Sequence, residues 1–189
     1  EIPLRLVGSE MCIRDRNMME TIVNSMEQYL KSMRQISDTA NYNIIQALDI
    51  SSPEFNQELS LLYDSNKDKI QSIALYDMEG ELLVAEPVTL QKEGVEVSRQ
   101  SWFENAKAKI ENMHFSTPHM QDLFQDDAKR YHWVISLSRA VDVIDGDSPE
   151  NGILLVDMKY SFIEEMMDRI NDRTRGRYYY LCDREGKLI

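Results

Sequence analysis

The run IQSIALYDMEGELLV at residues 70–84 predicts a β-hairpin. Its first half, Ile70 to Tyr76, is rich in apolar residues and favours a strand. The next four residues, Asp77 to Gly80, supply the acid and the glycine typical of a tight connection between antiparallel strands. Glu81 to Val84 is the expected return strand. The hairpin therefore predicts an antiparallel sheet.

Upstream of the hairpin we expect one long helix, because residues 17–50 contain neither Pro nor Gly. Apolar or small residues recur there three or four apart, a helical stripe of nearly heptad form. The stripe consists of Ile22, Met26, Tyr29, Met33, Ile36, Ala40, Ile44 and Ala47. Such a helix either packs along stacked modules or pairs with a second subunit, and we expect a homodimer through it. Ser52 and Pro53 are expected to cap and begin a second helix.

Downstream of the hairpin, further helices and strands alternate in an order typical of an α+β domain. A helix is expected at 102–110, strands at 131–137 and 152–156, and a last helix at 161–171. Residues 114–127 are expected to be irregular, and residues 141–151 to form a turn-rich loop. The predicted fold class is about five antiparallel strands flanked by helices.

Both ends of the sequence suggest that the chain is a piece of a longer protein. Val7 to Arg16 resembles a translated sequencing-adapter string, so we exclude residues 1–16 from the fold; a natural leader is the alternative. Tyr76 to Leu83 is echoed by Cys182 to Ile189, which indicates a repeated module or a chance recurrence of generic turn residues. We therefore expect a first module at 51–172 and the start of a second at 173–189.

Composition excludes several classes of function. The net charge of −12 and the lack of a Lys or Arg cluster argue against nucleic-acid binding. Cys12 and Cys182 form no disulfide framework, and no apolar run approaches the ~20 residues that cross a bilayer. Because phosphate-loop and nucleophile-elbow motifs are missing, we expect neither a cofactor nor catalysis.

The same segments together resemble the double Cache sensor region of bacterial sensor histidine kinases and chemoreceptors. The resemblance rests on the long helix, the hairpin, and three segments, QSWF at 100–103, WVISLSR at 133–139 and GILLVDM at 152–158. It implies a long helix packed on a PAS-like antiparallel sheet and a membrane-distal module that binds a small ligand outside the cytoplasm. It also implies a membrane anchor outside this chain and an output domain, expected to be a histidine kinase, with a chemoreceptor as the alternative.

The resemblance also implies where a ligand binds. The amino-acid-binding branch of the family has an Arg two positions before its Trp-aromatic pair and an Asp at the end of a late strand. Here the pair is Trp102-Phe103 and the acid is Asp157, but the Arg position holds Gln100. An ammonium group is thus expected at Asp157, whereas the guanidinium that binds a ligand carboxylate in that branch is missing at position 100, and Arg139 is another candidate for this role. The ligand stays open between an amino acid, a carboxylate or a similar solute.

Trp133 and Arg139 complete the expected ligand-binding set, each with an open alternative. Trp133 is otherwise a core residue, and Arg139 otherwise forms an ion pair with Asp157 or with a surface acid. Trp102 and Phe103 could equally be core, and Asp157 a turn residue.

Two other classes of function remain as rivals. A secreted hydrolase using His114 or His119 is one, and a purely structural dimerisation segment is the other. No metal site is expected, because His114, His119 and Asp122 match no common ligand spacing. The acids at 142, 145 and 147 likewise miss the register of a calcium loop.

Overall fold

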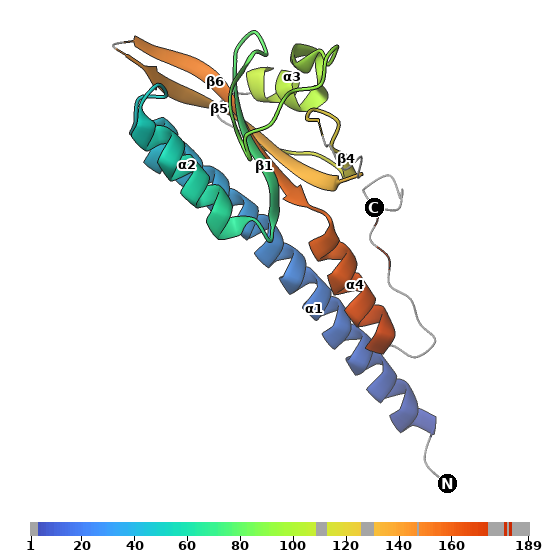
Figure 1. Ribbon diagram of the computed structural model, residues 1–189. Helices are drawn as coiled ribbons and strands as arrows, with labels where there is room; N and C mark the ends of the chain where they lie inside the picture. Colours follow the sequence, from blue (N-terminus) through green and yellow to red (C-terminus); the bar gives the residue numbers. More distant parts are fainter. Residues whose placement is uncertain are drawn as a thin grey trace.

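The computed structural model describes residues 4–108, 113–125, 131–146 and 148–173, with residues 180 and 182 (Figure 1). The expected second module at 173–189, including the second copy of the hairpin, lies almost wholly outside the described residues. Helix α1 is described from Leu4 onward.

The described strands form one antiparallel sheet in the order β2-β1-β6-β5-β3, and β4 also pairs with β5. Their bounds are β1 Ile70–Asp77, β2 Leu82–Glu86, β3 His114–Phe115, β4 His119–Met120, β5 Trp133–Asp145 and β6 Ser148–Lys159. The predicted hairpin is confirmed as β1 and β2. The predicted α+β class with an antiparallel sheet is also confirmed.

The expected loop at 141–151 is wrong, because β5 and β6 continue through it as a long hairpin. Val141 and Val143 are buried while Asp142 between them is exposed, which is the alternation of a strand. The connection between β5 and β6 includes Gly146, whose φ of 60° suits glycine. The acids and Pro149 gave this hairpin the composition of a loop. The expected irregular segment at 114–127 contains the two short strands β3 and β4.

The helices flank the sheet on both sides. They are α1 Leu4–Asp38, which continues as the π-helical segment η1 Thr39–Ile45, then α2 Pro53–Asn66, the short 3-10 helix η2 Val97–Arg99, α3 Ser101–Ala108 and α4 Ser161–Arg173. The expected N-cap of α2 is confirmed, since the Ser52 hydroxyl accepts a hydrogen bond from the Phe55 amide at 3.2 Å.

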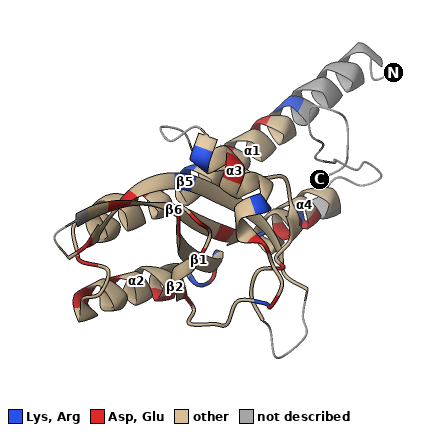
Figure 2. Ribbon diagram, turned by 90° about the horizontal axis from the view of Figure 1, so that it is seen from above, with Lys and Arg blue, Asp and Glu red and all other residues tan. Residues whose placement is uncertain are grey.

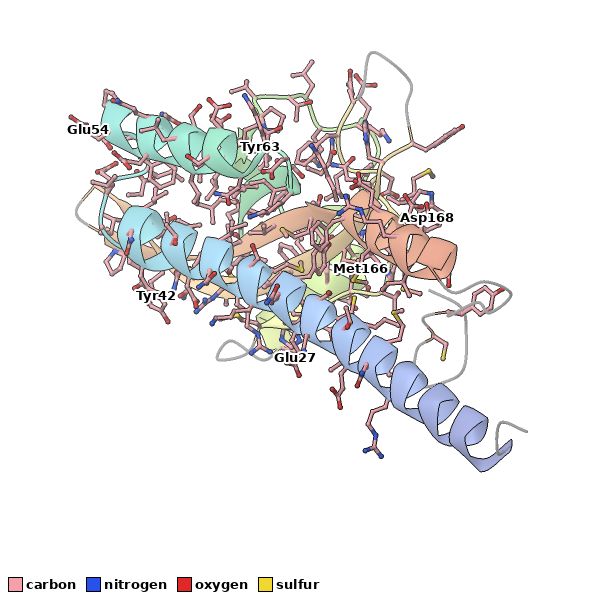
Figure 3. The ribbon with its side chains drawn as sticks, turned by 90° about the horizontal axis from the view of Figure 1, so that it is seen from below. Glu27, Tyr42, Glu54, Tyr63, Met166 and Asp168 are labelled. Carbon is pink, nitrogen blue, oxygen red and sulfur yellow. The ribbon has the colours of Figure 1, made fainter. Side chains whose placement is uncertain are left out.

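Strand alternation gives the sheet two faces with different partners. On the face that we call the α1 face, residues such as Leu75, Leu137 and Val156 pack against α1 and α2. On the opposite face, called the α3 face, Ala74, Tyr76 and Leu155 pack against α3. Figure 3 views the molecule from below, with side chains filling the space between the helices and the sheet. The long loops after β2 and before β5 add to the cover of the α3 face.

The stripe of α1 is part of the core of this chain. Tyr29, Met33, Ile36, Ala40 and Ile44 are all buried in the cluster of the α1 face. The helix therefore packs along the first module, and its packing along a second, stacked module stays a prediction. Dimerisation through α1 stays a prediction and would have to use another side of the helix.

Helices α1 and α4 run side by side away from the sheet (Figure 1). The rings of Tyr29 on α1 and Phe162 on α4 stack with centroids 5.4 Å apart. Within the described part of the chain, no helix combines the length and the apolar character needed to span a membrane.

Candidate functional site

A row of small polar side chains crosses the α3 face at one end of the sheet. Ser72 of β1 and Ser136 of β5 are the register partners of Asp157 on β6, so the three side chains lie on the same face. All three are buried, Asp157 to 1% exposure. Small hydroxyls beside a carboxylate leave room that apolar side chains would fill, so this row is where the α3 face departs from an ordinary core.

The carboxylate of Asp157 is buried and held by neutral donors. Its Oδ2 accepts a hydrogen bond from Ser72 Oγ at 2.9 Å, and its Oδ1 accepts a short one from Ser136 Oγ. Burial raises the pKa of Asp157 above its usual value, while hydrogen bonds from Ser136, Ser72 and Gln121 and the interaction with His119 oppose that shift. Desolvation is the largest cause, so the charged form would gain from a cation placed against it.

Aromatic rings line the α3 face beside this row. Tyr76 and Trp102 have ring centroids 5.6 Å apart, and Trp102 and Phe103 meet edge to face at 5.7 Å. Ser138 Oγ donates to the Trp102 carbonyl at 2.9 Å and thereby fixes the start of α3 on the sheet. Among the residues that the structure describes, the hydroxyl of Tyr76 and Nε2 of His114 are buried without a hydrogen-bond partner. Because unsatisfied buried polar atoms cost free energy, they are groups that a bound polar ligand would satisfy.

A groove of about 740 Å³ opens next to the carboxylate. Ser72 and Gln121, which both contact Asp157, line it, so Asp157 lies one side chain behind its wall. Lys159 and Glu164 supply charged groups to the same groove. The volume is within the range of pockets for small molecules.

The structure places the sequence-predicted residues in four settings. Trp102, Phe103 and Asp157 come together on the α3 face, and Trp133 is half-exposed at the rim of the groove. The backbone carbonyl of Gln100 accepts from the amides of Phe103 and Glu104 and so begins α3.

Arg139 lies on the α1 face, on the other side of the sheet from Asp157. Its guanidinium donates to Asp38 of α1 at 2.7 Å and lies over the Tyr42 ring at 5.5 Å. Of the ion pairs allowed by the sequence, the one with Asp157 is therefore not formed.

Sequence reasoning missed Ser72, Ser136, Gln121 and Lys159. A signal was present, because Ser72 and Ser136 are small hydroxyl residues at buried positions of otherwise apolar strands. The contact between Gln121 and Asp157 depends on a loop path that no periodicity predicts.

His119, Ser136 and Asp157 resemble a catalytic triad in composition but not in arrangement. In a triad the histidine lies between serine and acid and accepts the serine proton. Here Ser136 donates directly to Asp157, and His119 Nε2 is 3.4 Å from the same hydroxyl. The serine is thus bound to the acid and is not activated as a nucleophile. Among the described residues, no cluster of three or more His, Cys, Asp or Glu side chains could hold a metal ion.

Comparison with solved structures reveals the same fold in bacterial chemoreceptors. The ligand-binding domain of the Pseudomonas aeruginosa amino acid chemoreceptor PctC in complex with GABA has a TM-score of 0.67 at 17% identity, covering 93% of this chain and 73% of that one. The domain of PctB from the same organism, with L-Gln, gives 0.61 at 17%, covering 92% and 65%. The domain of Pseudomonas fluorescens CtaA, with L-serine, gives 0.63 at 17%, covering 95% and 72%.

These neighbours are Cache-type sensor domains, and the chain shares their fold. The chain spans between about two thirds and three quarters of the length of these three. A comparison with protein-family models found no match, and one with curated proteins found none either.

Proposed function

We propose that this chain is the extracytoplasmic ligand-sensing domain of a transmembrane signal-transduction receptor. The observation that carries the proposal is the buried carboxylate of Asp157, placed beside an aromatic wall in a fold shared with ligand-binding domains. The three neighbours compared above are parts of chemoreceptors, which favours a chemoreceptor over the histidine kinase expected from the sequence.

The ligand is a small solute that bears a protonated amine. An ammonium group against Asp157 would offset the desolvation that raises the pKa of this carboxyl. Phe124, Tyr131 and Trp133, which line the groove, would cover the apolar part of the ligand, and aromatic faces also attract cations. Gln100 offers an amide at the place of a guanidinium, so α3 is suited to a neutral group.

Signalling would pass through α1 and α4, which leave the sheet side by side. A ligand shifts such an element only through different affinities for its two positions. In this proposal the site meets this condition by closing Ser72, Ser136 and Asp157 around an ammonium, which would move β1, β5 and β6 together. In this proposal the receptor acts as a homodimer through the outer side of α1, where Met19 and Val23 are exposed. Figure 2 marks Asp and Glu on the ribbon of α2 and of several other elements, and Lys and Arg at separate points along the chain.

The test is a thermal-shift and calorimetric screen of the purified chain with amino acids, plain amines and carboxylates. A ligand at about 100 times its Kd stabilises a protein by about 2.7 kcal/mol. Stabilisation by an amine-bearing solute should disappear in Asp157→Asn and persist in Asp142→Asn, an exposed acid of the same hairpin. Carboxylates that stabilise the chain without an amine, or amines that still bind Asp157→Asn, would overturn the proposed site.

A further inference from the structure

We propose that Lys159 binds the anionic end of the ligand, so that the site selects solutes whose ammonium and carboxylate groups are separated by several carbons. This inference rests on the proposed function, in which Asp157 binds the ammonium end. It adds the partner that α3 lacks, since Gln100 cannot supply a positive charge.

The register of the sheet places Lys159 and Asp157 on one face, as neighbours along β6. Val134 and Ser136 of β5 pair with Lys159 and Asp157 of β6, so Lys159 and Asp157 are two residues apart on the same face. The Cα atoms of these two residues are therefore about 6–7 Å apart, and the ammonium of Lys159 extends to the carbonyl of Lys67, five residues before the Ser72 that contacts Asp157. A ligand that bridges the two charged groups therefore needs several carbons between its own. In an α-amino acid both charged groups are attached to one carbon, so such a ligand cannot reach both side chains at once.

The groove reaches Lys159 and stops one side chain short of Asp157. Lys159 lines it directly, and Ser72 and Gln121 line it in front of Asp157. The hydrogen bond recorded for the ammonium of Lys159 goes to the carbonyl of Lys67, a neutral acceptor that a carboxylate would outcompete. A charge-assisted bond of this kind is about twice as strong as a neutral one.

Glu164 of α4 lines the same groove and limits the affinity for an anion. Its carboxylate repels a ligand carboxylate bound by Lys159, because like charges at close range oppose each other. Glu164→Gln should therefore tighten binding of a zwitterion and leave binding of a plain amine nearly unchanged. A change confined to the zwitterion series identifies the carboxylate as the end of the ligand that lies near α4.

The experiment is a calorimetric titration with straight-chain ω-amino acids of four, five and six carbons, each compared with the plain amine of the same length. Lys159→Gln should weaken the best ω-amino acid about tenfold, which is about 1.4 kcal/mol, and leave its matched amine unchanged. Lys159→Arg should retain most of the affinity. Lys31→Gln, which removes one exposed lysine on α1, should change neither series.

The outcomes separate this inference from the proposed function. If amines bind through Asp157 and Lys159→Gln affects both series equally or neither, Lys159 is not the anion partner and the proposed function stands. The inference is equally overturned if α-amino acids bind more tightly than every ω-amino acid. If none of these probes binds, or if binding survives in Asp157→Asn, both the inference and the amine site fail.

Discussion

The phenol of Tyr29 on α1 donates a hydrogen bond to the backbone carbonyl of Lys159, 3.4 Å away at the end of β6. The same ring stacks on Phe162 in the first turn of α4, with an interplanar angle of 14°. The last residue of β6 thus presents its side chain to the groove and its carbonyl to α1. A ligand that moves this residue acts on α1 and α4 without any intermediate element.

Tyr29→Phe should lower the free energy of unfolding by about 0.5 kcal/mol, the low end for a hydrogen bond, because this bond is long. The ring and its stack on Phe162 remain in that variant. Tyr29→Ala removes both and should cost about 3–5 kcal/mol, as for other large core truncations. Urea denaturation measures both values. A Tyr29→Ala cost below about 1 kcal/mol would show that α1 does not depend on this contact.

The ion pair between Arg139 and Asp38 should contribute modestly to the attachment of α1 to β5. The arginine side chain is 13% exposed and the aspartate 43%, so solvent screens the pair only in part. We expect a coupling free energy of about 1 kcal/mol in a double-mutant cycle of Arg139→Met and Asp38→Asn. Zero coupling, with a large cost for Arg139→Met alone, would assign the effect to the packing of Arg139 on Tyr42 instead.

The sheet and its helices were predictable from local patterns. The apolar run of β1, the Ser52 cap and the stripe of α1 each depend on neighbours within a few residues. The long β5–β6 hairpin was not predictable in this way, because Asp142, Asp145 and Pro149 favour turns locally. Its buried Val141 and Val143 prevail because they fill the cluster of the α1 face.

The site was predictable only in part, for a reason of geometry. Asp157 follows an apolar run, so the sequence indicates its position at the end of a buried strand. Which side chains surround it depends on pairing between β1, β5 and β6, which brings residues more than eighty positions apart into contact, as with Ser72 and Asp157. The face of the sheet on which Arg139 lies was not predictable either. A shift of one residue along a strand changes the face, and the sequence alone did not establish which residues of β5 point to which side.

Gly152 should be the least replaceable glycine of the β5–β6 hairpin. A Cβ built there would lie 2.8 Å from the Tyr76 carbonyl oxygen and 2.9 Å from Cγ2 of Val143. Gly152→Ala should therefore cost about 1–3 kcal/mol through overpacking. Gly146→Asn is the matched variant, because a Cβ at that position would meet nothing within 4 Å and Asn tolerates a positive φ. It should cost less than half as much, and equal costs measured by urea denaturation would contradict the steric argument.

Asp157→Asn should stabilise the ligand-free chain relative to wild type at neutral pH. This gain in the free energy of unfolding should shrink as the pH falls. Burial raises the pKa of Asp157 in the folded state, so the folded chain holds this proton to a higher pH than the unfolded chain. The stability associated with the protonated carboxyl is complete below the unfolded pKa of about 3.9 and is lost as the pH rises through the folded pKa. Asparagine does not titrate, so the difference between the two proteins should be largest at pH 7 and shrink toward pH 4. Urea denaturation across this range measures it, with Asp142→Asn showing the effect of removing an exposed carboxyl.

Amine binding should change in the opposite sense, weakening as Asp157 is protonated. Parallel stability curves for wild type and Asp157→Asn would mean that this carboxyl is as well solvated in the folded chain as in the unfolded one, and the reason for a cation at this position would be lost.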